Sequence, residues 1–338
     1  MHSKMKDRQF RVALIGCGAI AFNHFKALEH VENAKVVALC DLKPEKCADY
    51  INKFGLEARI YTDYIEMYDT EKPDAVHITT PHYLHAEMTV AALERGIDVF
   101  LEKPMCISIE EIEQILEAEK KSTARVCVSF QNRFLTAVRE ALRIAEEDGG
   151  AIAANFSVFW QRTVPYYTES GWRGSYATEG GGVMINQAIH SIDMLTLFLG
   201  KPVSVCATKS NHHLKGVIEV EDTCEGVIEF EGGRQANFYA TTSATGMDCT
   251  AVTVITKNHR IRIEPPELYV DGERIPFDAE IAAIGKRCYG NGHYKLIPKF
   301  YEAIETGDEM PITAESAQYA LRILLTAYKS NDEKTIIL

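Results

Sequence analysis

The stretch Val12-Ala13-Leu14-Ile15-Gly16-Cys17-Gly18-Ala19-Ile20-Ala21 decides the fold of this chain. An apolar run of strand length is followed at once by the pattern G-x-G-x-x-A. Gly16 permits a tight turn out of the strand, Gly18 lets the backbone approach a pyrophosphate, and Ala21 is small enough for a helix to pack on the strand. The free N–H groups at the start of that helix favour bound phosphate. The loop therefore predicts a dinucleotide site.

A second apolar run, Val36 to Leu39, leads to Asp41, which lies 25 residues after Gly16 (41 − 16). A carboxylate at the end of this second strand can accept hydrogen bonds from both ribose hydroxyls of the adenosine half, and it repels a 2′-phosphate. The sequence thus favours NAD, and NADP is disfavoured because of Asp41. A glycine-rich turn also occurs in other α/β proteins. Here the strand before it, the helix after it and the acid at the end of the second strand all favour a dinucleotide site.

Length and composition describe an ordinary globular protein, and 338 residues correspond to about two domains. The net charge of −12 argues against a nucleic-acid partner, although it allows an anionic small molecule held by a few Arg or Lys. Nine scattered cysteines without a C-x-x-C pair indicate reduced thiols and a cytoplasmic location. The polar start indicates no signal peptide, and no apolar run approaches the ~18 residues of a membrane helix.

Apolar strands and helices alternate at βαβ spacing for about 120 residues. This alternation predicts an NAD-binding Rossmann domain over residues 8–130, with a doubly wound parallel sheet covered on both faces. The pattern changes after Arg133, where longer strands between 151 and 263 predict an open, mainly antiparallel sheet in a C-terminal α/β domain, 131–338. Helices are expected at 183–199, at 296–306 with Pro298 in its first turn, and at 314–329. An open sheet face is commonly buried on a partner, so we expect a homodimer or homotetramer.

Ligands of doubly wound sheets bind outside the carboxyl ends of the strands. Three predicted strand ends carry polar clusters, at Thr79–His82, Glu102–Pro104 and Gln131–Arg133. Lys103 directly follows a buried strand, where its loop should border the nicotinamide. A lysine there can hydrogen-bond a substrate hydroxyl and stabilise the developing alkoxide. The alternative is a surface lysine in a loop, the usual place of this residue type.

A second polar cluster follows the glycine run 180–182. Asn186, His190 and Asp193 stand at i, i+4 and i+7 of an otherwise apolar helix, so they share one face. A histidine that titrates near neutrality can take a hydroxyl proton while hydride leaves the carbon. The alternative is a core histidine bonded to a neighbour, but three polar groups on one face favour a site.

The loop before that helix contains aromatic and basic residues, namely Arg162, Tyr166, Tyr167, Trp172 and Arg173. Aromatic faces suit sugar rings, and an arginine fork suits a carboxylate or a phosphate. A loop packed by its own aromatic residues is an equally good interpretation. His82, His85 and His293 lack the spacing of a metal site, and no metal is expected.

Taken together, these motifs resemble the Gfo/Idh/MocA oxidoreductase family, over close to the full length of the chain. The resemblance is carried by Gly16–Ala21, Thr80–His85, Glu102-Lys103-Pro104, Gln131–Phe134 and Gly180–Gly200, of which Glu-Lys-Pro with the later histidine helix is the most specific. It implies that Lys103 and His190 carry catalysis with Asn186. It implies cofactor contacts by Gly16, Gly18, Ala19, Ile20, Asp41, Thr80, Pro81, His82, His85, Glu102, Lys103 and Gln131. It implies substrate contacts by Arg162, Tyr167, Trp172, Arg173, Asn186 and His190.

One departure from the family concerns Asn186, since many members have Asp four residues before the histidine. A neutral amide cannot stabilise an imidazolium as a carboxylate does. The forms Trp172-Arg173-Gly174 and Ile185-Asn186-Gln187 look like those of members that act on nucleotide sugars or amino-sugar derivatives. The main hypothesis is an NAD-dependent oxidoreductase acting on a ring hydroxyl or ketone of a sugar, cyclitol or (nucleotide-)sugar derivative. The alternatives are an NAD-dependent glycoside hydrolase that acts by transient oxidation, and a non-catalytic NAD-binding regulator.

Overall fold

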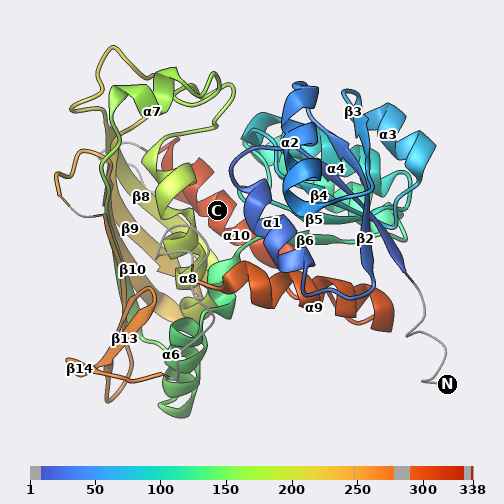
Figure 1. Ribbon diagram of the computed structural model, residues 1–338. Helices are drawn as coiled ribbons and strands as arrows, with labels where there is room; N and C mark the ends of the chain where they lie inside the picture. Colours follow the sequence, from blue (N-terminus) through green and yellow to red (C-terminus); the bar gives the residue numbers. More distant parts are fainter. Residues whose placement is uncertain (1–8, 247, 278–289, 331–335, 338) are drawn as a thin grey trace. The chain divides into compact units, whose positions relative to one another are not determined.

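The computed structural model describes residues 9–246, 248–277, 290–330 and 336–337, and these form two compact units (Figure 1). The first unit extends to Cys106 and includes Glu110–Ser129 and His293–Ser316. The second comprises Ile107–Ile109 and the described residues within Phe130–Gly292 and Ala317–Leu338. His293–Ser316 thus packs with the first unit, although the division expected from the sequence grouped it with the second.

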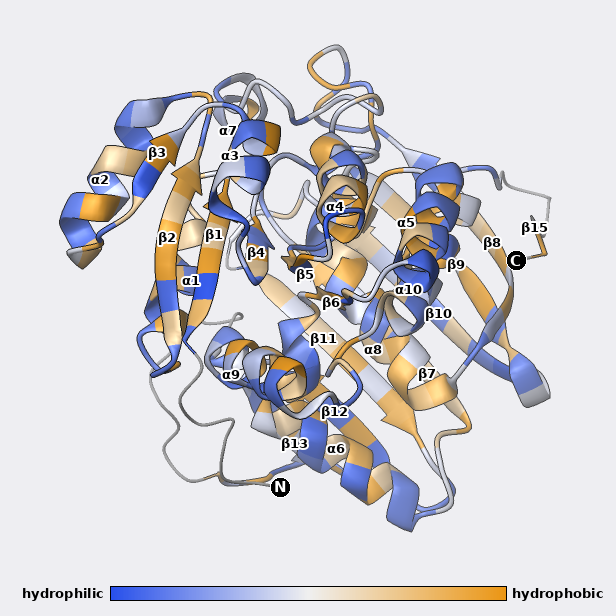
Figure 2. Ribbon diagram, turned by 90° about the vertical axis from the view of Figure 1, so that its right-hand side faces the viewer, coloured by the Kyte–Doolittle hydropathy of each residue, from blue (hydrophilic) through white to orange (hydrophobic). Residues whose placement is uncertain are grey.

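The first unit is built on a six-stranded parallel sheet, which confirms the doubly wound architecture. All of its strands except the exposed edge strand Arg59–Tyr61 are mostly buried and read as apolar runs, and Figure 2 colours β1 and β2 mostly as hydrophobic. The order across the sheet is β3-β2-β1-β4-β5-β6. The strands are β1 (Phe10–Ile15), β2 (Ala34–Cys40), β3 (Arg59–Tyr61), β4 (Ala75–Ile78), β5 (Asp98–Leu101) and β6 (Val126–Val128).

Local signals set the ends of several helices in this unit. In α2 (Pro44–Phe54), proline occupies the first turn and Gly55 ends the helix in the left-handed region, with φ of 63°. The side chain of Asp63 caps α3 (Tyr64–Glu71) by accepting two backbone N–H groups. The other helices are α1 (Ala21–Leu28), α4 (His85–Leu93), which follows a short 3-10 turn, and α5 (Ile109–Lys121).

Helix α9 (Gly292–Thr306) returns to the first unit late in the chain. The prediction that Pro298 lies in its first turn was wrong, because the helix begins at Gly292 and the proline lies inside it. The helix packs through aromatic rings: Tyr301 lies 5.5 Å from Phe10, and Phe300 lies 5.4 Å from Phe100, between ring centroids. These contacts join α9 to β1 and β5.

The second unit contains a nine-stranded sheet in which every pairing is antiparallel except that of β7 with β10, which confirms a mainly antiparallel sheet. The order is β14-β13-β12-β11-β7-β10-β9-β8-β15. The strands are β7 (Ala153–Phe159), β8 (Pro202–Ser210), β9 (Thr223–Phe230), β10 (Arg234–Thr241), β11 (Cys249–Ile255), β12 (Arg260–Glu264), β13 (Glu267–Val270), β14 (Glu273–Arg274) and β15 (Ile336–Ile337). The helices are α6 (Thr136–Glu147), α7 (Val164–Thr168), α8 (Ile189–Leu199) and α10 (Ala314–Ala327).

The central strands of this sheet bury one face and expose the other. Helix α8 packs on β7, β10 and β11, and burial alternates along β7 and most of β10. By register, Phe159, Val227, Tyr239 and Ile255 share the opposite face, where they are 37–46% exposed. Among the helices that the structure describes, none has both the length and the apolar character needed to cross a bilayer.

Candidate active site

The glycine turn after β1 has the geometry that its sequence predicts. Gly16 has φ of +90°, and a Cβ added there would lie 2.7 Å from the carbonyl oxygen of Thr79. Only glycine fits this position without a backbone shift. A Cβ added at Gly18 would meet nothing within 4 Å, so this side of the loop is open to a ligand. The loop then passes through Ala19 to Ile20, the N-cap of α1.

Asp41 stands beside that turn, at the end of β2. Its Oδ2 accepts the backbone N–H of Cys17 at 2.8 Å, and its Oδ1 accepts the N–H of Lys43 at 2.9 Å. The carboxylate is therefore held against the glycine loop, although 24 residues separate the two in sequence. This is the arrangement expected of the acid that reads the adenosine ribose.

His85 ties together the loops that follow β4 and β5. Its Nε2 lies 2.9 Å from the carbonyl oxygen of Thr80, and its Nδ1 lies 2.6 Å from that of Pro104. Burial lowers the pKa of this imidazole, and the two carbonyls act in the opposite direction. His82 is also buried, at 5% exposure, directly after Pro81. The predicted residues at both strand ends thus lie in one connected region of the first unit.

Glu102 is buried and accepts hydrogen bonds from several parts of the first unit. Its carboxylate is 5% exposed, and its Oε1 lies 3.0 Å from the Nε2 of His24 and 3.0 Å from the Nε2 of His293. Its Oε2 accepts the backbone N–H of Lys103 at 3.3 Å. Burial alone would raise the pKa of Glu102, but the two imidazoles hold it well below the ordinary value. Lys103, at the end of β5, is half-buried.

Two imidazoles and a carboxylate are also side chains that can bind a divalent metal ion. Here the Nε2 atoms of both histidines lie within hydrogen-bond distance of the same carboxylate oxygen. We therefore interpret the contacts as hydrogen bonds in which each N–H donates to Glu102. Sequence spacing did not reveal this cluster, because His24, Glu102 and His293 come from distant parts of the chain.

Gln131, the predicted cofactor contact beyond β6, belongs to the second unit and is 2% exposed. Its side-chain oxygen is buried and has no hydrogen-bond partner among the described residues, and the same holds for the side-chain oxygen of Asn132. Buried polar atoms in native proteins are normally satisfied by protein, water or a ligand. The described residues thus leave both side-chain oxygens without a hydrogen-bond partner.

The helix that carries His190 begins irregularly. Residues Met184–Ala188, which include Asn186, form a π-helical turn before α8. Such turns occur frequently at functional sites, and apolar periodicity did not predict this one. His190 is half-buried, and its ring meets the ring of Phe130 edge-on at 5.9 Å between centroids.

The polar stripe predicted on this helix divides between two networks. Asp193 forms a buried, two-point ion pair with Arg133, at 2.9 and 2.6 Å. Asn186 instead donates to the carboxylate of Glu179 at 2.5 Å, and the same carboxylate accepts the backbone N–H of Gly174 at 2.6 Å. Glu179 is 1% exposed, and burial raises its pKa to about 7. A carboxylate that sequence reasoning missed thus stands behind the neutral amide of Asn186.

Two arginines flank the ring of Tyr166. The guanidinium carbons of Arg162 and Arg173 lie 4.9 and 4.5 Å from its centroid, within cation–π range. The hydroxyl of Tyr166 accepts from the side-chain amides of Asn186 at 3.2 Å and Gln187 at 3.4 Å. This cluster connects the basic and aromatic loop to the π-helical turn.

Trp172 and Tyr167 are placed differently from each other. Trp172 is half-buried and lies 4.7 Å from the guanidinium carbon of Arg173. Tyr167 is 4% exposed and packs in a hydrophobic cluster with Leu214, Ile218 and Val220. The ring of Tyr167 is therefore part of the core, and Tyr166 is the tyrosine that contacts Asn186 and both arginines. The Nε atoms of both arginines are buried without a hydrogen-bond partner among the described residues.

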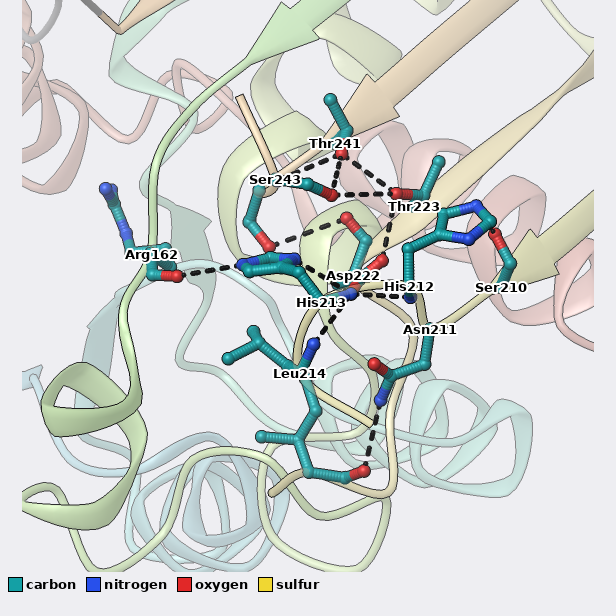
Figure 3. A network of polar contacts seen from close by, with 12 residues as sticks. Arg162, Ser210, Asn211, His212, His213, Leu214, Asp222, Thr223, Thr241 and Ser243 are labelled. Carbon is teal, nitrogen blue, oxygen red and sulfur yellow. Dashed lines mark hydrogen bonds and ion pairs between the residues drawn. The ribbon is translucent and has the colours of Figure 1, made fainter. Parts of the chain in front are cut away.

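Asp222 organises the loop that supports Arg162 (Figure 3). Its Oδ2 accepts the backbone N–H groups of His212 at 2.8 Å, His213 at 2.9 Å and Leu214 at 3.3 Å. The ring of His213 bridges this oxygen, at 3.0 Å, and the carbonyl oxygen of Arg162, at 3.1 Å. Burial would raise the pKa of Asp222, but the donated hydrogen bonds together lower it.

Comparisons with known proteins agree with this geometry. Inositol 2-dehydrogenase of Rhizobium meliloti (strain 1021) is 28% identical over an alignment of 343 positions, which covers 96% of this chain and 97% of that protein. D-glucoside 3-dehydrogenase of Escherichia coli (strain K12) is 26% identical over 251 residues, 69% of this chain and 70% of that protein. The WlbA dehydrogenase from Bordetella pertussis, solved in complex with NADH and UDP-GlcNAcA, is 26% identical with a TM-score of 0.85, over 98% of both chains.

Two family models together match well over half of the chain. Residues 10–130 match the oxidoreductase family with an NAD-binding Rossmann fold, and residues 138–263 match the GFO/IDH/MocA C-terminal domain. The glycine turn, the acid at the end of β2 and the Glu102-Lys103-Pro104 segment lie within the first match. The chain therefore belongs to the Gfo/Idh/MocA family of oxidoreductases.

Proposed function

We propose that this protein is an NAD-dependent dehydrogenase that acts on a ring hydroxyl or ketone of a sugar, a cyclitol or a sugar derivative. The observation that carries the proposal is the position of Lys103 at the carboxyl end of β5, next to a buried carboxylate. This is the edge of a doubly wound sheet at which ligands bind. Relatives named as dehydrogenases of inositol and of a glucoside support the substrate class.

The glycine loop fits an NAD pyrophosphate, because the side of Gly18 is open and the N-terminal turn of α1 follows. NAD is proposed over NADP, since Asp41 is held beside this loop where a 2′-phosphate would meet its negative charge. Titration calorimetry with both cofactors tests the choice. Equal affinity for NADP would contradict it.

Once bound, the nicotinamide supplies the site that takes or gives hydride. Lys103 is proposed to donate a hydrogen bond to the reacting oxygen and to stabilise its developing negative charge. His190 is proposed to take the hydroxyl proton. Asn186 is proposed to orient the substrate, with Glu179 fixing the amide through the bond at 2.5 Å.

The arginines around Tyr166 favour a substrate that carries an anionic group. Arg162 is partly balanced by Asp248, whose Oδ2 lies 3.6 Å away, and the charge of Arg173 acts on the buried Glu179. The Nε atoms of both arginines are buried without a hydrogen-bond partner among the described residues. A carboxylate or phosphate pairs well with a guanidinium. The solved WlbA dehydrogenase contains a nucleotide sugar, UDP-GlcNAcA, which is anionic. We therefore propose an acidic or nucleotide-linked sugar in preference to a neutral one.

A substrate screen tests the function. The purified protein is incubated with NAD and a panel of neutral sugars, cyclitols, sugar acids and nucleotide sugars, and NADH is followed by absorbance. Lys103→Ala and His190→Ala should each abolish turnover, with the exposed Lys201→Ala as a matched control. Full activity of Lys103→Ala would refute the assignment. Sugar release without net NADH would instead show a hydrolase, and NAD binding without any turnover would show a regulator.

We also propose a homo-oligomer and a cytoplasmic location. The outer face of the second sheet carries the exposed apolar residues Phe159, Val227, Tyr239 and Ile255, which a second copy of the chain would cover. The eight described cysteines are free, in keeping with a reducing compartment. Analytical ultracentrifugation at micromolar concentration tests the assembly, and a monomer would contradict it.

A further inference from the structure

The first unit contains a buried line of polar side chains that leads to Glu102, and the proposed chemistry gives no role to the tyrosine and histidines in it. Each side chain contacts the next, and all are at most 5% exposed. The Tyr301 hydroxyl lies 2.8 Å from the Nε2 of His77, and the Nδ1 of His77 lies 2.8 Å from the Nδ1 of His24. The Nε2 of His24 then meets the Oε1 of Glu102, which the Nε2 of His293 also meets, both at 3.0 Å. The line joins α9, β4 and α1 to the end of β5.

Counting protons along this line shows which side chain donates in each hydrogen bond. Each neutral imidazole carries one N–H and one acceptor nitrogen. If Tyr301 donates to His77, then the Nδ1 of His77 carries its proton and donates to His24. His24 must in turn carry its own proton on Nε2, which donates to Glu102. Every contact is satisfied when all three imidazoles are neutral and Glu102 is ionised.

The opposite direction of donation is less favourable, because it leaves one buried hydrogen-bond donor without an acceptor. If His24 donated to His77, its Nε2 would be an acceptor and Glu102 would have to be protonated. His77 would then donate to the oxygen of Tyr301, and the tyrosine O–H would need another acceptor. The structure gives that hydroxyl no other hydrogen-bond acceptor among the described residues, and Tyr301 is only 2% exposed. A buried donor without an acceptor is strongly disfavoured.

We propose that Tyr301, His77, His24 and His293 are positioning residues that keep Glu102 a carboxylate, and that this buried negative charge keeps the ammonium of Lys103 protonated. The inference rests on the proposed catalytic role of Lys103. The Tyr301 hydroxyl sets the direction of the line, and His293 supplies a second, independent donor to the same oxygen.

The environment of Glu102 agrees with this assignment. Burial and the neighbouring imidazole lower the pKa of His77, and burial lowers that of His24, so both rings are neutral at physiological pH. The positively charged group adjacent to Glu102 in sequence is Lys103, and His85 on α4 feels the charges of both. The backbone N–H of Lys103 donates to Glu102 at 3.3 Å, and an opposite charge nearby favours the charged form of an amine. Lys103 can therefore act as a hydrogen-bond donor throughout the neutral range.

Infrared spectroscopy of the protein without substrate tests the first half of the proposal. Difference spectra between pH 8 and pH 5 should show no protonated carboxyl band from Glu102 in the wild type, with Glu102→Gln identifying the band. Tyr301→Phe and His293→Leu should each raise the apparent pKa of Glu102 by about one pH unit or more, so that in a titration towards acid pH the protonated band appears at a higher pH than in the wild type. His293→Gln keeps an N–H donor and should resemble the wild type. Circular dichroism and NAD binding confirm that each variant is folded.

Kinetics test the second half. In Glu102→Gln the alkaline limb of the kcat profile should move down by at least about one pH unit, since Lys103 loses its stabilising charge. Three results would overturn the proposal: a protonated Glu102 band in the wild type at neutral pH, a band that appears at the same pH in both variants as in the wild type, or an unmoved alkaline limb in Glu102→Gln. One equivalent of tightly bound metal in the purified wild type would also overturn it. The infrared result is independent of turnover, so a failure of the proposed function would be recognised separately.

Discussion

Replacing Glu179 with glutamine should change how the stability of the second unit depends on pH. Glu179 is 1% exposed, and burial raises its pKa from 4.5 to about 7. A carboxyl group whose pKa is higher in the folded state than in the unfolded state binds more protons when folded between those two values. Its contribution to stability is therefore fully present below pH 4.5 and is lost as the pH rises through about 7.

The size of the effect follows from the two pKa values. The interval from 4.5 to about 7 corresponds to a loss of about 3 kcal/mol, at 1.36 kcal/mol for each pH unit. Glutamine cannot ionise, so the variant lacks this slope. It also offers one acceptor oxygen to the two donors, Gly174 N–H and the Asn186 amide, which lowers stability by about 1–3 kcal/mol at every pH. The pH-dependent and the pH-independent changes in the free energy of unfolding can therefore be measured separately.

Urea unfolding followed by tryptophan fluorescence is a suitable assay. The chain has two tryptophans, Trp160 and Trp172, and both belong to the same unit as Glu179. Unfolding free energies at pH 5, 6, 7 and 8 are compared between the wild type and Glu179→Gln, because the difference cancels the titration of all other groups. The exposed Glu231→Gln is a matched control and should keep the wild-type slope. If the wild type and Glu179→Gln have parallel pH profiles, the buried carboxyl interpretation is refuted.

Three further changes have defined outcomes. Gly16→Ala should weaken NAD binding more than tenfold in titration calorimetry, because its Cβ would lie 2.7 Å from the carbonyl oxygen of Thr79. Arg133→Leu leaves the buried Asp193 charge unpaired and should lower the free energy of unfolding by about 3–5 kcal/mol, whereas adding Asp193→Leu should recover most of it in urea denaturation. Asp222→Asn should cost about 1–3 kcal/mol at pH 7. Since the folded pKa of Asp222 is lowered, this difference should disappear in thermal unfolding as the pH falls through that pKa; a constant difference would contradict the hydrogen-bond account.

The first unit was predictable because its signals are local. Buried parallel strands are continuous apolar runs, and the turn at Gly16 requires a backbone conformation that only glycine adopts readily. The acid at position 41 could be placed by counting from that turn. The same logic found the Glu102-Lys103-Pro104 segment, since it directly follows an apolar strand.

The partners of the site residues were not predictable, because they are contacts between distant segments. Nothing in the local pattern pairs Asn186 with Glu179, or divides the helix face so that Asp193 binds Arg133. The π-helical turn was also missed, since apolar periodicity does not distinguish it from an α-helical turn. Tyr166 and Tyr167 are adjacent in sequence, and only packing decides which one faces the polar cluster.

The return of α9 to the first unit has a consequence for biosynthesis. The six parallel strands have all been synthesised by residue 128, but Phe300 and Tyr301 follow more than 160 residues later. At ordinary translation speeds the nascent polypeptide waits roughly 10–30 s for them. During that interval the rings of Phe10, His77 and Phe100 lack their final covering, and this nascent surface is where a ribosome-associated chaperone would bind.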